Sequence, residues 1–204
     1  ECTEDPIRRL RKKEFLIPEV RRELSQNIRI RAQSNDGEAR KTHELTAQQE
    51  NALSRINSAV DSGRGRTLLL HGVTGSGKTE VYIQAIEHVV KQAGSAIVLV
   101  PEISLTPQTR GRFEDRFQNV AVLHSQMSAS ERHFHWQRIR RGEVQVVIGP
   151  RSAVFAPLPN LGLIVIDEEH DTSFKQDKQP RYHARKVAHA RAMALGIPLV
   201  LGSA

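Results

Sequence analysis

Short apolar runs alternate with longer segments of helical period from Thr46 to the end of the chain. Six runs have the length of strands. They are Thr67–His71, Ala96–Val100, Val120–His124, Val144–Ile148, Leu163–Asp167 and Pro198–Gly202. Strands that alternate with helices predict an α/β fold, in which a mainly parallel sheet is covered by helices on both faces. Ligands of such sheets bind beyond the carboxyl ends of the strands, where the motifs described below fall.

Several residues mark where helices should begin and end. Ser128 and Glu131 have the spacing of a capping box, which opens a helix. Thr106 followed by Pro107 predicts an N-cap with proline at the first helical position. Glycines stand where three helices should stop, at Gly94, Gly142 and Gly196.

The first 45 residues have a different character. A basic run extends from Arg8 to Lys13, Glu19–Leu24 could form a short helix, and Asn35–Gly37 is a turn signal. We expect residues 1–45 to be the tail of an upstream domain with a linker, and residues 46–204 to form the main domain. The basic run has two interpretations, a DNA contact or a solvated helix face. Without an initiator Met, and with an apolar run at its end, the chain looks cut at both ends.

Composition narrows the class of protein. The 204 residues carry a formal charge of +7, which favours polyanionic partners such as nucleic acid but also fits a merely soluble basic protein. Cys2 is the only cysteine, so no disulfide forms within the chain and a reducing compartment is the simplest setting. No signal-peptide pattern is present, and no apolar run approaches the roughly 20 residues that cross a bilayer. We therefore expect a cytoplasmic protein that does not contact a membrane.

A phosphate-binding loop follows the first apolar run. The sequence fits the pattern G-x-x-x-x-G-K-[ST] and precedes a helical segment. Its glycines let backbone N–H groups face phosphates, its lysine reaches the β- and γ-phosphates, and its threonine hydroxyl can ligate Mg²⁺. We expect nucleotide contacts from the whole loop and the next residue: Gly72, Val73, Thr74, Gly75, Ser76, Gly77, Lys78, Thr79 and Glu80. A chance glycine-rich turn is the alternative.

Acidic residues end the run Leu163–Ile166. A carboxylate at a strand tip beside a phosphate loop can hold Mg²⁺, and this role fits Asp167. Glu168 is placed to orient or deprotonate the attacking water. An acidic loop that caps a helix is the alternative. His170 either couples the nucleotide site to a second domain or bonds locally.

These motifs resemble those of superfamily-two helicases, because Asp167–His170 reads DEEH. Further stretches are similar to the bacterial replication-restart helicases within that superfamily. The resemblance extends from about Leu45 to Ala204. The stretches are Leu99–Ile103, Leu105–Gln108, Gly149–Ala153, Pro180–Arg185 and Gly202–Ala204.

The resemblance implies a RecA-like fold and roles for further residues. Gln49 would read adenine, although it also has capping-box spacing with Thr46. Ser203 would couple hydrolysis to DNA movement. DNA contacts would come from two motifs and a loop, whose stacking and phosphate-binding residues are Pro101, Glu102, Thr106, Gln108, Arg151, Ser152, Phe174, Lys175, Arg181, Tyr182 and Arg185. Ordinary turns and a packed loop are the alternatives. Gln126 and Lys186 depart from the family pattern, where Gly and Asp are expected.

The implied function is ATP-dependent DNA unwinding in replication restart and primosome assembly, with this chain as the first motor lobe. The cofactors would be ATP and Mg²⁺, and the DNA single-stranded and forked. Primosome and single-strand-binding proteins would be partners. Arginine fingers would come from a second lobe, so we expect the chain alone to be nearly inactive. The family's zinc region would lie beyond Ala204.

Three other functions stay open. One is another superfamily-two translocase or repair helicase. The second is a nucleotide-responsive DNA-binding module without turnover. The third is a phosphate-loop kinase, which would not explain Arg151 and Ser152. A zinc site within this chain is not expected, because His133 and His135 are two positions apart on a predicted helix and face different directions.

Overall fold

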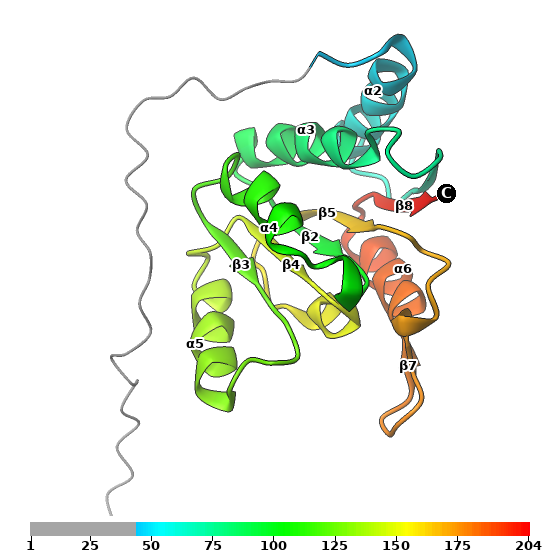
Figure 1. Cartoon of the computed structure of the whole chain (residues 1–204). Coiled ribbons are helices and arrows are strands. Elements are labelled where there is room, and N and C mark those ends of the chain that lie inside the picture. The colour runs from blue at the N-terminus through cyan, green and yellow to red at the C-terminus, as the bar shows by residue number, and fades with distance from the viewer. Residues whose placement is uncertain (1–43) are drawn as a thin grey trace, which may run out of the picture. The chain divides into compact units, whose positions relative to one another are not determined.

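A computed structural model describes residues 44–204 (Figure 1). Predictions for the basic run, the short helix and the turn before Glu44 lie outside the described residues. Six strands form one sheet in the order β1-β8-β5-β2-β4-β3, and every pairing is parallel. The strands are β1 Thr67–His71, β2 Ser95–Leu99, β3 Val120–Val122, β4 Val146–Gly149, β5 Leu161–Ile166 and β8 Leu199–Ser203. The predicted strands are confirmed, with boundaries within two residues.

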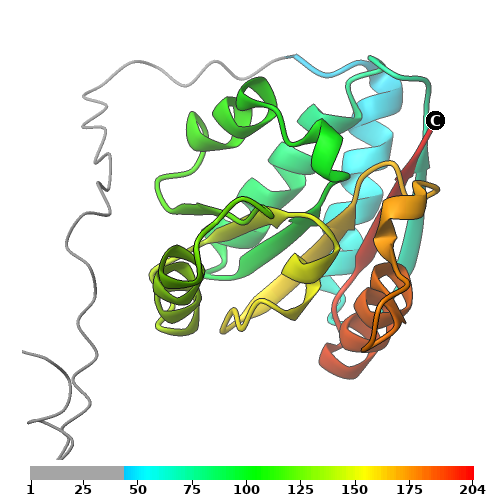
Figure 2. The ribbon, with the colours of Figure 1, turned by 60° about the horizontal axis from the view of Figure 1, so that its bottom comes forward.

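Helices cover both faces of the sheet (Figures 1 and 2). One face carries α2 (Ala47–Asp61), α3 (Lys78–Lys91) and α4 (Pro107–Glu114). The other carries α5 (Ala129–Arg140), the 3₁₀ helix η2 (Arg151–Phe155) and α6 (Ala184–Leu195). The chain also forms the 3₁₀ helices η1 (Glu102–Ser104) and η3 (Thr172–Phe174), and a hairpin of β6 (Lys175–Gln176) and β7 (Tyr182–His183).

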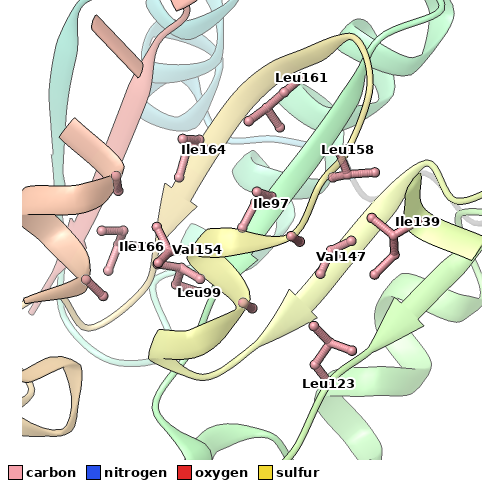
Figure 3. Packing of buried hydrophobic residues seen from close by; sticks show 14 of the residues in the cluster. Ile97, Leu99, Leu123, Ile139, Val147, Val154, Leu158, Leu161, Ile164 and Ile166 are labelled. Carbon is pink, nitrogen blue, oxygen red and sulfur yellow. The ribbon is translucent and has the colours of Figure 1, made fainter. Parts of the chain in front are cut away.

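Each buried strand supplies two cores by the alternation of its side chains. On β2, Ala96 and Val98 pack with α3 and α4. Ile97 and Leu99 face the other way and pack with α5, η2 and α6 (Figure 3). A run that is apolar at every position is therefore explained by burial on both faces.

The predicted helix caps mostly agree with the structure. The side chains of Thr106 and Ser128 cap α4 and α5, and Gly142 and Gly196 adopt left-handed conformations with φ of 73° and 68°. Helix α3 also stops just before Gly94, as predicted, and the Gly94 amide donates to the Val89 carbonyl at 3.0 Å. The left-handed residue after α3 is Ala93, and a side chain at Gly94 would approach Val89 within 2.7 Å.

Because the six strands are parallel, their carboxyl ends share one edge of the sheet, called here the carboxyl edge. The loops after β1, β5 and β8 are neighbours there, and those after β2, β4 and β3 continue the row. Among residues 44–204, no helix is both long enough and apolar enough to traverse a membrane.

Candidate nucleotide-binding site

The loop between β1 and α3 is anchored to the neighbouring strand. The Gly72 amide donates to the carbonyl of Ser203 at 3.0 Å. Gly75 and Gly77 both have φ of +82°, in the left-handed region that glycine adopts without steric cost. A side chain at Gly75 would meet no atom within 4 Å, so open space borders this turn.

Lys78 is the buried cation of this loop, at 8% exposure. Its Nζ donates to the carbonyl of Gly72 at 2.5 Å and more weakly to that of Val73 at 3.4 Å. It also lies 3.8 Å from Glu168 Oε1. Burying an ammonium group costs free energy unless anionic or carbonyl oxygens surround it. The two loop carbonyls and the Glu168 carboxylate therefore hold the charged end of Lys78 at the loop.

Gln49 has two sets of contacts. Its Oε1 accepts from the Thr46 amide at 2.8 Å and completes a capping box on α2, as the spacing predicted. Its Nε2 donates to the Ser76 carbonyl at 2.9 Å, and a side chain at Gly77 would collide with it. Gln49 therefore holds the loop between β1 and α3 against the start of α2. Its contact with adenine stays a prediction.

Asp167 follows β5 at the carboxyl edge. Tyr82, which is buried on α3, donates its hydroxyl to Asp167 Oδ1 at 3.2 Å. Burial, and then repulsion from Glu168, raises the pKa of Asp167. Burial and the two carboxylates also raise the pKa of Tyr82 far above its usual range, so its hydroxyl stays a donor. A bound cation would favour the ionised form of Asp167.

Glu168 connects the acidic strand end to the neighbouring groups. Its backbone is left-handed, with φ of 48°, which is uncommon for a side chain of this size. Besides Lys78 it approaches His170, whose Nε2 lies 3.7 Å from Glu168 Oε2. The other ring nitrogen of His170 is 3.5 Å from Ser203 Oγ. The ends of β1, β5 and β8 thus bring Lys78, Glu168, His170 and Ser203 into one cluster.

Glu80 is directed elsewhere. Its Oε1 accepts from Arg116 at 3.1 Å and from Gln84 at 2.9 Å. Arg116, at 7% exposure, also pairs with Glu87 at 2.8 Å. The Glu80 side chain therefore ties α3 to the segment after α4, and its predicted nucleotide contact stays a prediction.

The residues predicted to contact DNA are spread along the rest of the carboxyl edge. Pro101 is buried, whereas Thr106 and Gln108 are exposed at the start of α4. Glu102 Oε1 accepts from the Ser125 amide at 2.9 Å. Arg151 donates to the Ser173 carbonyl at 2.8 Å, and Ser152 follows it on η2.

The basic residues of the hairpin region are exposed and have local partners. Lys175 lies 3.1 Å from Asp177, and Arg181 donates to the Asp177 carbonyl at 3.0 Å. Arg185 pairs with Glu169 at 2.6 Å. These exposed pairs are weak, so a phosphate can compete for the cations. Contacts with DNA stay predictions.

A model of the DEAD/DEAH box helicase family matches residues 42–204. The chain belongs to this family. It is 55% identical over 161 residues to the replication restart protein PriA of Bacillus subtilis, covering 78% of this chain and 20% of that protein. It is 58% identical over 139 residues to PriA of Synechocystis, covering 67% and 17%. The resemblance to replication-restart helicases is therefore confirmed. This chain, whose residues 42–204 form the helicase domain, covers about a fifth of the length of these relatives.

The structure of RecG bound to a three-way DNA junction is similar to this helicase domain. The TM-score is 0.59 with 26% identity, over 79% of this chain and 21% of RecG. This likeness, with the parallel sheet and its helices, confirms the RecA-like fold.

Helicases of this family use ATP and Mg²⁺, and the site's own groups fit both. The loop supplies glycine turns, open space and a buried ammonium, which suit a triphosphate. Thr79 opens α3 beside Lys78, and Asp167 ends β5. A hydroxyl and a carboxylate are hard oxygen donors, which Mg²⁺ prefers.

Phe174 corrects one prediction for the helicase domain. It was expected to offer a stacking surface, but it is fully buried, at 0% exposure, in the core beneath α6. Its ring cannot stack on a base. The prediction was wrong because the sequence of a basic loop does not indicate whether the ring of its aromatic residue points toward solvent or into the core.

Phe174→Ala should therefore act on stability. We expect a loss of about 3–5 kcal/mol, as for other buried aromatic truncations. Urea unfolding of the variant measures this cost. A stability unchanged from that of the wild type would contradict the burial.

Sequence reasoning missed Tyr82 and Arg116. Tyr82 stands in the apolar run Val81–Ile83, where a buried tyrosine requires a partner for its hydroxyl. That requirement could have signalled a polar contact, but not which one. Arg116 gave no signal, because its partners Glu80 and Glu87 are far away in sequence.

Gly202 leaves room for the Tyr82–Asp167 contact. A side chain there would collide with the Tyr82 hydroxyl and lie 3.0 Å from Asp167 Oδ1. Gly202→Ala should cost about 1–3 kcal/mol of stability by overpacking. The cost should shrink when Tyr82→Phe removes the hydroxyl. Urea unfolding of the single and double variants tests this, and equal costs in both backgrounds would contradict it.

Proposed function

We propose that the chain is the first motor lobe of an ATP-driven DNA helicase that acts in replication restart. The observation that carries the proposal is the convergence of Lys78, Glu168 and Asp167 at the ends of β1 and β5. The replication restart relatives support the biological role. The RecG complex with a three-way junction supports forked DNA as a substrate, together with single-stranded DNA.

Each residue of the site has a role in the proposed hydrolysis. The loop Gly72–Gly77 and Lys78 bind the phosphates, with Gln49 on adenine. Thr79 and Asp167 would hold Mg²⁺, which neutralises charge on the β- and γ-phosphates. Glu168 orients the attacking water and accepts its proton.

Coupling to DNA movement would pass through His170 and Ser203. His170 lies between Glu168 and Ser203, so a change in the contacts of Glu168 reaches the end of β8 directly. The DNA strand would lie across the loops after β2 and β4, on the same carboxyl edge. Arg151 and the exposed cations Lys175, Arg181 and Arg185 would neutralise its phosphates.

The domain organisation and partners belong to the same proposal. Residues 1–45 would be an upstream tail and linker, and residues 46–204 the lobe itself. A second RecA-like lobe would supply arginine fingers, typically worth about 10³ to 10⁵ in rate. Primosome and single-strand-binding proteins would be partners, zinc would bind outside this sequence, and the protein would act in the bacterial cytoplasm.

ATP turnover of the full-length protein with and without single-stranded DNA tests the proposal. We expect DNA to stimulate turnover, and forked DNA to bind more tightly than linear DNA. Turnover that ignores DNA would refute a motor. Equal binding of forked and linear DNA would favour another superfamily-two translocase, and nucleotide binding without any turnover would favour a DNA-binding module.

A further inference from the structure

We propose that Tyr82 is a positioning residue of the Mg²⁺ site: its hydroxyl orients the Asp167 carboxylate and thereby sets how tightly the metal binds. This inference rests on the proposed function, in which Asp167 is a metal ligand, and adds a second residue on which that role depends. Tyr82 lies on α3 one helical turn after Lys78, and its hydroxyl donates to Asp167 Oδ1 at 3.2 Å. The contact joins the helix that follows the phosphate-binding loop to the end of β5.

Core packing explains the ring of Tyr82 but not its hydroxyl. The side chain is 1% exposed and belongs to the core that α3 forms with the sheet. Its neighbours Val81 and Ile83 are also buried in this core. A phenyl ring would fill the same space without needing a hydrogen-bond partner, whereas a buried phenol requires one. The hydroxyl therefore adds a polar contact that apolar packing does not call for, and the contact goes to the residue predicted to hold the metal.

A donor on a buried ring is fixed in position. Side chains in a close-packed core occupy a single rotamer well, so the Tyr82 hydroxyl stays at one point beside β5. Asp167 is only half-buried and follows the last residue of that strand. A hydrogen bond from a fixed donor holds its carboxylate in one orientation. This preorganisation lowers the conformational entropy that is lost when the carboxylate binds a ligand.

The neighbouring strand β8 leaves space for this contact. A side chain at Gly202 would collide with the Tyr82 hydroxyl and lie 3.0 Å from Asp167 Oδ1. The Gly202 carbonyl accepts from the Glu169 amide at 2.8 Å, which ties β8 to the loop after β5 at the same level. Three elements, α3, β5 and β8, therefore meet around the hydroxyl and define its place.

The expected consequence concerns the affinity for metal and not the affinity for nucleotide. Outer-shell hydrogen bonds that orient a ligating carboxylate are worth about 10- to 100-fold in metal affinity. Lys78 does not depend on the Tyr82 hydroxyl, because the Gly72 carbonyl and Glu168 hold its ammonium group. Loss of the hydroxyl should therefore raise the Mg²⁺ concentration that the site needs and leave the binding of metal-free ATP unchanged.

Tyr82→Phe tests the proposal in the full-length protein without DNA. A fluorescent ATP analogue is titrated at a series of Mg²⁺ concentrations. The titrations give the affinity for the metal-free analogue and the Mg²⁺ concentration at which half of the tightening by metal is reached. We expect the variant to need about ten-fold more Mg²⁺ than the wild type and to bind the metal-free analogue equally well. DNA-stimulated turnover should show the same shift in Mg²⁺ dependence, with kcat at saturating Mg²⁺ within a few-fold of the wild type.

Two further variants separate the hydroxyl from the fold and from the metal site. Ile83→Val removes one methylene group from the buried neighbour of Tyr82, which lowers stability but leaves the hydroxyl of Tyr82 in place. It should need the same Mg²⁺ concentration as the wild type. Asp167→Asn removes the carboxylate and should abolish the tightening by Mg²⁺.

The three variants give distinct outcomes. Wild-type Mg²⁺ dependence in Tyr82→Phe, beside loss of the Mg²⁺ effect in Asp167→Asn, would overturn the positioning role and leave the proposed function intact. An equal shift in Tyr82→Phe and Ile83→Val would also overturn it, because the integrity of the core and not the hydroxyl would then support the site. A full Mg²⁺ effect in Asp167→Asn would overturn the metal site itself.

Discussion

Lys78→Ala should lower the DNA-stimulated ATP turnover of the full-length protein by about 10²- to 10³-fold, the cost of removing one preorganised charge-stabilising group. The ammonium is buried at the loop and is held there by the Gly72 carbonyl and Glu168. Alanine leaves no cation for the β- and γ-phosphates. Release of inorganic phosphate at saturating DNA measures the loss.

The matched control is Lys91→Ala. Lys91 is an exposed lysine at the end of the same helix, α3, so its removal changes the net charge equally. Its turnover should equal that of the wild type. Comparable activity in Lys78→Ala and the wild type would contradict the assignment of the loop.

Glu168→Gln should separate binding from hydrolysis. The amide keeps the shape of the side chain but cannot accept a proton from water, so turnover should fall by about 10²- to 10⁴-fold. Nucleotide affinity should change little, because the loop and Lys78 remain. Single-turnover hydrolysis, with titration of a fluorescent ATP analogue, measures both quantities.

Glu169→Gln is the control for this second prediction. Glu169 adjoins Glu168 but pairs with Arg185 at 2.6 Å, away from Lys78. Its turnover should remain within a few-fold of the wild type. An equal loss of turnover in both variants would mean that hydrolysis depends on the negative charge of this acidic segment, and not on proton acceptance by the Glu168 carboxylate.

The features that sequence predicted were those encoded over short distances. The strand Thr67–His71 and the loop that follows it have local patterns, so both could be identified from consecutive residues. The capping residues Thr106 and Ser128 act within four residues of themselves and were likewise predictable.

The features that sequence did not predict depend on contacts between distant segments. Tyr82 and Asp167 are 85 positions apart, and only the fold brings them together. Phe174 could not be assigned inward or outward from a single isolated aromatic residue.

We propose that the loop Gly72–Gly77 and Asp167 form a single site for ATP and Mg²⁺. Calorimetric titration of this chain with ATP, with and without Mg²⁺, tests this shared site when wild type and Asp167→Asn are compared. We expect Mg²⁺ to tighten ATP binding to the wild type by about 10- to 100-fold, and the variant to lose this gain. An identical Mg²⁺ effect in the two proteins would mean that Asp167 does not hold the metal beside the bound nucleotide.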